Sequence, residues 1–231
     1  MPILQLERVL RRQQTPPVDP VANLEGVGVS LGGRPVLRGV SLTVEPGEVL
    51  GISGANGSGK TTLVRTLATL QRPHEGNGSI LGVDFDTSDL VSVRKQIGLI
   101  GHTPALVPEL SLRENLTHIA KLAGIDVARV DPALEVVGLD EAGDRQAEAA
   151  SFGMKRRIEV AHLLLRKPRF LLLDEAVSGL DVSASELIGA LIETNIERGG
   201  ATVMVSHDSD YLRAVCQRTM YLTTGRLEVA T

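Results

Sequence analysis

The segment from Gly54 to Thr61 limits the possible folds of this chain more than any other. It reads Gly-Ala-Asn-Gly-Ser-Gly-Lys-Thr and matches every fixed position of the pattern G-x-x-x-x-G-K-[ST], whose backbone cradles phosphate groups. The apolar run Val49–Ile52 precedes it and predicts a buried strand, and a helical pattern from Lys60 to about Leu70 follows. A glycine-rich turn with a chance Lys-Thr is the alternative, and the flanking strand and helix argue against it. The segment therefore predicts a phosphate-binding loop in an α/β fold.

The residue types in this loop suit a polyphosphate ligand. Glycines allow backbone N–H groups to turn inward and approach phosphates closely, and the N-terminus of the following helix adds a positive dipole end. Lys60 can place its charge on the β- and γ-phosphates, and the Thr61 hydroxyl can ligate Mg²⁺. The candidate binding residues of the loop are Gly54, Ala55, Asn56, Gly57, Ser58, Gly59, Lys60, Thr61 and Thr62.

A second apolar run, Phe170–Leu173, is followed by two acids, Asp174 and Glu175. Open α/β sheets bind ligands at the carboxyl ends of their strands, so we expect both carboxylates at that edge. Asp174 can hold Mg²⁺, usually through water. Glu175 can polarise an attacking water as a general base. Two solvated acids after a strand are the alternative interpretation.

Strand and helix patterns alternate along most of the chain. We expect an α/β fold with a P-loop NTPase core, that is, a mostly parallel sheet with helices on both faces, plus an antiparallel β layer and a helical subdomain at 103–165. Besides the elements named above, the predicted strands are Val27–Leu31, Val36–Val44, Ile97–Ile100 and Ala201–Val205. The predicted helices are Ser111–Leu122, Pro132–Val137, Phe152–Leu165 and Val182–Glu197.

The chain divides into a short extension and one domain. Residues 1–20 form an N-terminal extension that ends in a proline-rich linker, and residues 21–231 form one nucleotide-binding domain. Met1–Leu10 fits a short amphipathic helix, and both a mobile extension and a docking helix remain open. Its charged residues are too many for the apolar region of a signal peptide.

Charge and cysteine content exclude several functions. The formal net charge is -4 at pH 7, so the chain lacks the basic field that holds nucleic acid, and we expect no nucleic-acid partner. Cys216 is the single cysteine, which excludes an internal disulfide framework and fits a reducing compartment. Charges interrupt every apolar stretch before the roughly 18 residues that span a bilayer, so we expect no transmembrane segment.

From about Asn23 to Val229 the chain resembles the ATP-binding subunits of ABC transporters. Five pieces occur in that family's order, and the ordered set is specific although the signature piece alone is weak. The pieces are the phosphate loop Gly54–Thr62, the glutamine-loop segment Ile97–His102, the signature segment Ala150–Arg157, the segment Leu173–Asp181 and the switch-histidine segment Val203–Asp208.

The resemblance implies ATP and Mg²⁺ as cofactors and Lys60, Glu175 and His207 as catalytic residues. His207 is expected to contact the γ-phosphate in its own subunit, and a solvated loop histidine is the alternative. In this family two subunits pair around two nucleotides. The resemblance therefore implies a homodimer, or a pair with another nucleotide-binding subunit.

Three further residues take their expected roles from this pairing. Ser151 and Gly153 are expected to cap the γ-phosphate held by the other subunit, because the start of the helix there offers free amides. Asp181 is expected to lie across the dimer seam and also to be the N-cap of the helix that begins at Val182.

The chain departs from the family pattern at several positions. His102 occupies the place of the glutamine that senses Mg²⁺ and the lytic water, and we include it with Thr61 and Asp174 as a candidate metal ligand, since imidazole can ligate or hydrogen-bond. An ordinary loop role for His102 stays open. The signature segment has Phe152 and Met154 where Gly and Gln are usual. Leu31 occupies the place of the aromatic that stacks on adenine.

These features predict an ATP-hydrolysing subunit that drives an integral membrane partner from the cytoplasmic face of the cell membrane, as a peripheral protein. The segments Ile100–Pro104 and Leu110–Leu116 are similar to those of heme exporter ATP-binding subunits in cytochrome c maturation. A multidrug- or ion-type exporter is the next alternative. A soluble non-transport ABC ATPase and a non-catalytic nucleotide-binding regulator remain as competing classes.

Overall fold

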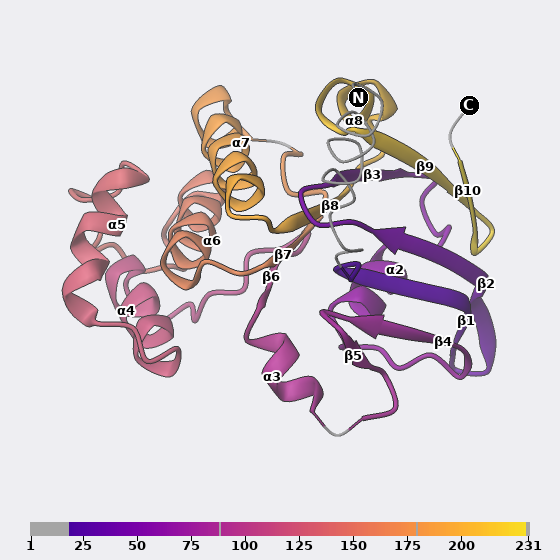
Figure 1. The fold of residues 1–231 in the computed structure, drawn as a ribbon. Coiled ribbons are helices and arrows are strands. Elements are labelled where there is room, and N and C mark those ends of the chain that lie inside the picture. The colour runs from indigo at the N-terminus through magenta and orange to yellow at the C-terminus, as the bar shows by residue number, and fades with distance from the viewer. Residues whose placement is uncertain (1–18, 88, 179, 230–231) are drawn as a thin grey trace, which may run out of the picture.

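The computed structural model describes residues 19–87, 89–178 and 180–229, which form two sheets and a group of helices (Figure 1). The predictions made for residues 1–18, a short helix and a mobile extension, lie outside the described residues. The division of the chain into an extension and one domain stays a prediction.

A six-stranded sheet occupies the centre of the molecule. Its strands are β3 (Val49–Ser53), β6 (Ile97–Ile100), β7 (Phe170–Asp174), β8 (Ala201–Val205), β9 (Arg218–Thr223) and β10 (Arg226–Val229). They lie in the order β10-β9-β3-β8-β7-β6. All pairings from β9 to β6 are parallel, and β10 pairs antiparallel with β9 at one edge. The expected mostly parallel sheet is confirmed.

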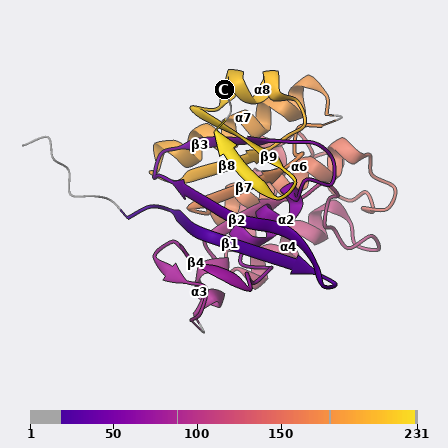
Figure 2. The same cartoon turned by 90° about the vertical axis from the view of Figure 1, so that its right-hand side faces the viewer.

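A second, antiparallel sheet lies beside the first (Figures 1 and 2). Its strands are β1 (Ala22–Leu31), β2 (Arg34–Val44), β4 (Glu75–Ile80) and β5 (Val83–Asp84). They follow the order β2-β1-β4-β5. The antiparallel layer is confirmed, although β4 and β5 were not predicted, because Glu75–Ile80 contains two glycines and no alternation of apolar residues.

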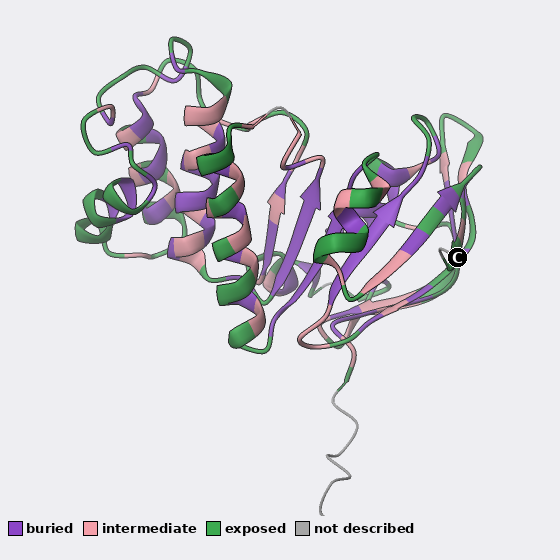
Figure 3. Ribbon diagram, turned by 90° about the horizontal axis from the view of Figure 1, so that it is seen from above, coloured by how far each residue is buried: buried purple, intermediate pink, exposed green. Residues whose placement is uncertain are grey.

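Successive residues of the central strands enter two different cores. Leu172 packs in the core between the two sheets, whereas Leu171 and Leu173 pack in the core on the helical side. Helix α2 (Lys60–Leu67) lies between the sheets and contacts both. Because both faces of the strands are covered, the strands read as continuous apolar runs rather than alternating ones. Figure 3 shows these buried strands between layers with exposed outer faces.

The helical side is formed by a group at one end of the sheet. The helices are α4 (Leu112–Leu122), η1 (Val127–Arg129), α5 (Val130–Val136), α6 (Phe152–Arg166) and α7 (Val182–Glu197). Helix α6 contacts α4, α5 and α7 (Figure 1). Two short helices, α3 (Leu90–Arg94) and α8 (Ser209–Val215), were not predicted.

Two helix ends differ from the predictions by more than one residue. Helix α2 ends at Leu67 rather than near Leu70, because Thr69 adopts a left-handed backbone with φ of 58°, which stops the helix. Helix α5 begins at Val130 rather than Pro132. Proline is tolerated there because the first turn of a helix needs no intrahelical N–H donors.

No helix in the described part of the chain combines the length and the apolarity needed to cross a membrane.

Candidate functional site

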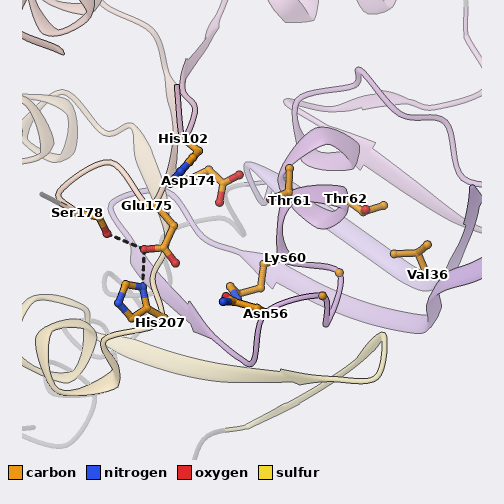
Figure 4. Close-up of a pocket in the computed structure, with 12 residues that line it drawn as sticks. Val36, Asn56, Lys60, Thr61, Thr62, His102, Asp174, Glu175, Ser178 and His207 are labelled. Atoms are coloured by element: carbon orange, nitrogen blue, oxygen red, sulfur yellow. Dashed lines mark hydrogen bonds and ion pairs between the residues drawn. The ribbon is translucent and has the colours of Figure 1, made fainter. Parts of the chain in front are cut away.

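A cavity of about 620 Å³ opens where the strands of the central sheet reach their carboxyl ends (Figure 4). The loop after β3, His102 after β6, the end of β7 with the residues that follow it, and His207 after β8 all converge there. The lining residues are Val36, Asn56, Gly57, Gly59, Lys60, Thr61, Thr62, His102, Asp174, Glu175, Ser178 and His207. The cavity therefore collects candidates predicted from four separate segments: the phosphate loop, the segments that end in His102 and contain Asp174 and Glu175, and the switch-histidine segment.

The loop between β3 and α2 owes its shape to its glycines. A Cβ at Gly54 would lie 2.4 Å from the carbonyl oxygen of Leu222, so only glycine lets the loop pass β9. Gly59 precedes α2 with φ of 109°, which side-chain residues rarely adopt. Inside the loop, the Ser58 hydroxyl is buried and has no hydrogen-bond partner among the described residues.

Lys60 supplies a buried positive charge at the base of the cavity. The residue is 8% exposed, and its ammonium donates to the carbonyl oxygens of Gly54 at 2.7 Å and Ala55 at 3.0 Å. Among the described residues, no carboxylate lies within ion-pair distance of this ammonium. A buried cation held only by carbonyl dipoles is costly unless an anion joins it, so this position fits a phosphate group.

Asp174 and Thr61 form the metal-compatible end of the cavity. Asp174 is 5% exposed, and burial raises the pKa of its carboxyl. A hydrogen bond with the Thr61 hydroxyl and the nearby charges of His102 and Lys60 oppose that rise, while Glu175 adds to it. A hydroxyl and a carboxylate side by side are the oxygen donors that Mg²⁺ takes, so these residues fit the ion.

His102 lies beside Asp174 in the cavity, as Figure 4 shows. The described residues contain no cluster of three or more histidine, cysteine or acidic side chains able to hold a metal ion. A cation at Asp174 would therefore take its further ligands from water or from a bound molecule. This is the arrangement expected where a metal travels with a polyphosphate.

Glu175 and His207 form a second polar pair across the cavity. The Glu175 Oε2 lies 3.0 Å from His207 Nδ1 and accepts a hydrogen bond from the Ser178 hydroxyl at 2.9 Å (Figure 4). The Glu175 side chain is 15% exposed, whereas that of His207 is 68% exposed. One carboxylate oxygen is thus occupied, and the other is left for a ligand or water.

Two lining residues were not predicted as site residues. Ser178 lies three residues after Glu175 in a turn, in which its N–H donates to the Glu175 carbonyl oxygen and its hydroxyl donates to the Glu175 carboxylate, and no sequence pattern indicates this contact. Val36 reaches the cavity from β2, far away in the sequence, and no local pattern indicates it. Leu31, the residue at the adenine-stacking position, is 42% exposed and does not line the cavity.

Ser151, Gly153 and Asp181 lie apart from the cavity but close to one another. The Ser151 hydroxyl caps α6 by accepting from the N–H of Met154 at 3.2 Å. A Cβ on Gly153 would lie 3.8 Å from a carboxylate oxygen of Asp181. Asp181 caps α7, as predicted, by accepting from the N–H of Ala184 at 2.7 Å. The role of these three residues toward a second subunit stays a prediction.

A parallel sheet whose carboxyl edge combines a phosphate loop, an acid–hydroxyl pair and a glutamate–histidine pair defines a nucleotide-binding protein of the P-loop class. Within this class, the family model described as ABC transporter matches residues 37–178. The chain belongs to that family.

Two relatives show how broad the similarity is. The methionine import ATP-binding protein MetN of Corynebacterium diphtheriae is 36% identical over 199 residues, which cover 83% of this chain and 58% of MetN. The cytochrome c biogenesis ATP-binding export protein CcmA of Methylococcus capsulatus is 38% identical over 195 residues, which cover 84% of this chain and 94% of CcmA. The chain thus spans only part of the MetN relatives and nearly all of CcmA.

Solved structures agree with the fold. An ATP-binding subunit of an ABC transporter superposes with a TM-score of 0.82 at 26% identity, covering 90% of this chain and 88% of its own. The ATP-binding cassette MJ0796, a dimer in a post-hydrolysis state bound to ADP and Pi, gives a TM-score of 0.80 at 26% identity, covering 90% and 98%.

Proposed function

We propose that this chain is the ATP-binding and ATP-hydrolysing subunit of an ABC transporter. One observation carries the proposal: a single cavity joins the buried Lys60 ammonium, the Thr61–Asp174 pair and the Glu175–His207 pair. These are the parts that phosphoryl transfer to water requires, namely an anion cradle, ligands for a metal and a base.

The loop from Gly54 to Thr62 binds the phosphates through backbone N–H groups and Lys60. Thr61 and Asp174 hold Mg²⁺, and His102 is proposed as a further ligand because it lies beside Asp174 (Figure 4). When bound, Mg²⁺ neutralises charge on the phosphate oxygens.

Glu175 is the group that takes the proton of the attacking water. Its partly buried carboxylate accepts a hydrogen bond from the Ser178 hydroxyl and faces the exposed His207 ring. His207 is therefore placed to orient Glu175 and to donate a hydrogen bond to the terminal phosphate. A base fixed on one oxygen loses little entropy when the water arrives.

The proposed active unit is a pair of chains, either two copies or one copy with another nucleotide-binding subunit. Ser151, Gly153 and Asp181 form a cluster outside the chain's own cavity, which suits a role at the partner's nucleotide. The dimeric state of the similar cassette MJ0796 with ADP and Pi supports this arrangement. The pair is proposed to drive an integral membrane subunit as a peripheral protein on the cytoplasmic face.

Heme export in cytochrome c maturation is the transport function we favour. The support is the His102 segment and the coverage of CcmA, which the chain matches along 94% of its length. Copurification of tagged chain from its native host, followed by identification of the membrane subunit, tests this assignment. A methionine-import, multidrug- or ion-type membrane partner would replace it, and recovery of soluble partners alone would favour a non-transport ABC ATPase.

Lys60→Ala tests the nucleotide site. Because the phosphates would lose their one buried ammonium, we expect tight binding of fluorescent ATP with Mg²⁺ to be lost, measured by titration of the purified chain. Lys121→Ala removes an exposed lysine of α4 and is the matched control. Unchanged affinity in Lys60→Ala would contradict the phosphate-loop assignment.

A further inference from the structure

The loop that carries His102 is held in place by two side chains of α6. Residues 101–110 contain no helix or strand and are mostly exposed. Arg156 donates to the carbonyl oxygens of Gly101 at 2.9 Å and His102 at 3.2 Å. The backbone N–H of Ala105 donates to Glu159 at 3.1 Å. Three successive points of an irregular loop are therefore fixed to one helix.

The two side chains form an ion pair inside the protein. The Arg156 Nη1 lies 2.6 Å from Glu159 Oε2, and the two side chains are 1% and 10% exposed. Burial lowers the pKa of the Arg156 guanidinium and raises that of Glu159, and the charge of each partner opposes the shift of the other. Buried ion pairs are replaceable by apolar residues of similar volume with little loss of stability. Stability alone thus does not explain why charged groups occupy this position.

The same arginine also lies near the start of α6. Its guanidinium is 5.2 Å from the centre of the Phe152 ring, and Phe152 directly follows the N-cap Ser151. The rigid, planar guanidinium of Arg156 therefore connects the backbone of His102 with the first turn of α6. The side chain of His102 faces the cavity. Arg156 has further hydrogen-bonding capacity, because its buried Nε has no partner among the described residues.

We propose that Arg156 and Glu159 are positioning residues that lock the His102 loop to the start of α6, so that both shift as one body when nucleotide binds. The inference rests on the proposed function, since it needs a nucleotide in the cavity. As a consequence, nucleotide binding at the chain's own phosphate loop would shift the position of Ser151 and Gly153. These two residues are proposed to contact the nucleotide of the other subunit. The pair therefore carries coupling free energy between two sites.

The double variant Arg156→Met/Glu159→Met tests the lock. It keeps the buried volume and removes both charges, so we expect a folded protein with a melting temperature near that of the wild type. Glu159→Gln is the milder variant, because it retains an acceptor for the Ala105 N–H. Asp144→Asn is the matched control, since it removes an exposed ion pair with Arg113 in the same group of helices.

Two measurements separate positioning from a merely structural role. The first compares affinity for fluorescent ATP, at concentrations too low for pairing, with ATP-driven pairing followed by light scattering. We expect unchanged affinity in every variant, but pairing weakened at least about fivefold in the double variant, the low end of measured site-to-site coupling. The second is hydrogen exchange of monomeric protein. ATP should slow exchange at 101–105 and 151–157 in the wild type, but only at 101–105 in the double variant.

The outcomes are distinguishable. Wild-type pairing and exchange in the double variant would overturn the inference, and so would a parallel loss of affinity and pairing, which indicates a structural role. If the double variant does not fold, the same two measurements are made on Glu159→Gln. We expect the ATP-driven pairing of Glu159→Gln to be weaker than that of Asp144→Asn. Failure of the wild type to bind ATP would instead contradict the proposed function.

Discussion

At the scale of single residues, Glu175 gives the sharpest prediction. Glu175→Gln keeps the size of the side chain and an acceptor for the Ser178 hydroxyl, but amide oxygen is too weak a base to take a proton from water. We expect ATP binding to persist and phosphate release to fall at least about a hundredfold. Light scattering with ATP should then show a long-lived pair. Glu135→Gln, at an exposed position of α5, is the control, and normal turnover in Glu175→Gln would place the base elsewhere.

The proposed role of His102 as a metal ligand predicts that an imidazole nitrogen contacts the bound ion. If its imidazole is a ligand, Mn²⁺ bound with ATP to protein containing ¹⁵N-labelled histidine should show a ¹⁵N coupling in pulsed electron paramagnetic resonance, since imidazole is a good ligand for such ions. His102→Gln should remove the coupling, and His118→Gln, an exposed position of α4, should leave it. Bound Mn²⁺ without any coupling in the wild type would show that His102 is not a ligand.

At the scale of elements, α4 begins with a complete capping box. The Ser111 hydroxyl accepts from the N–H of Glu114 at 3.1 Å, and the Glu114 carboxylate accepts from the N–H of Ser111 at 2.8 Å. Ser111→Ala should lower the free energy of unfolding by about 1 kcal/mol, measured by urea denaturation. Thr117→Ala within the same helix is the control. Equal stability of the two variants would mean that the cap contributes nothing.

Elements with local signals were predictable from the sequence, and those that depend on partners were not. The helix Val182–Glu197 was predicted with its bounds because Asp181 caps it, and β6 and β8 because they are short apolar runs. In contrast, Glu75–Ile80 becomes a strand through its pairing with β1 and β5, which are distant from it or equally hard to recognise in the sequence. A Cβ at Gly78 would lie 2.5 Å from Phe85, so this strand depends on a close packing that composition does not reveal.

In the candidate site too, residues with local sequence signals were predicted and a residue placed by distant packing was not. Lys60, Asp174, Glu175 and His207 meet in one cavity because each follows a strand of the same parallel sheet, which the patterns indicated. Val36 was not found, because only the packing of the antiparallel sheet against the loop brings it there.

At the scale of the whole molecule, His162 predicts sensitivity to acid. It lies in a cavity of about 550 Å³ that also has Lys95 and Arg166 in its lining. Burial, with a smaller contribution from the charge of Arg166, lowers the pKa of His162 from 6.5 to about 4. Between pH 6.5 and pH 4 the His162 imidazole binds a proton in the unfolded chain but stays neutral in the folded chain. The free energy of unfolding therefore falls as the pH drops through this window.

The variant His162→Gln isolates this contribution. From pH 6.5 to pH 4 the wild type should lose up to about 3 kcal/mol more unfolding free energy than the variant, as measured by urea denaturation at a series of pH values. The carboxylates, which titrate in both proteins, cancel in the comparison. Identical pH profiles would show that His162 is free to protonate in the folded protein.

At the backbone of Glu175, the stability of the fold and the proposed catalytic activity make opposite demands. With φ of 54°, it occupies a region that costs a side-chain residue on the order of 1–2 kcal/mol, and its N–H is tied to the carbonyl of Val205 at 2.9 Å. Glycine would relieve that cost and leave nothing to activate water. A search for heat-resistant variants that ignored turnover would therefore favour an inert protein at this position.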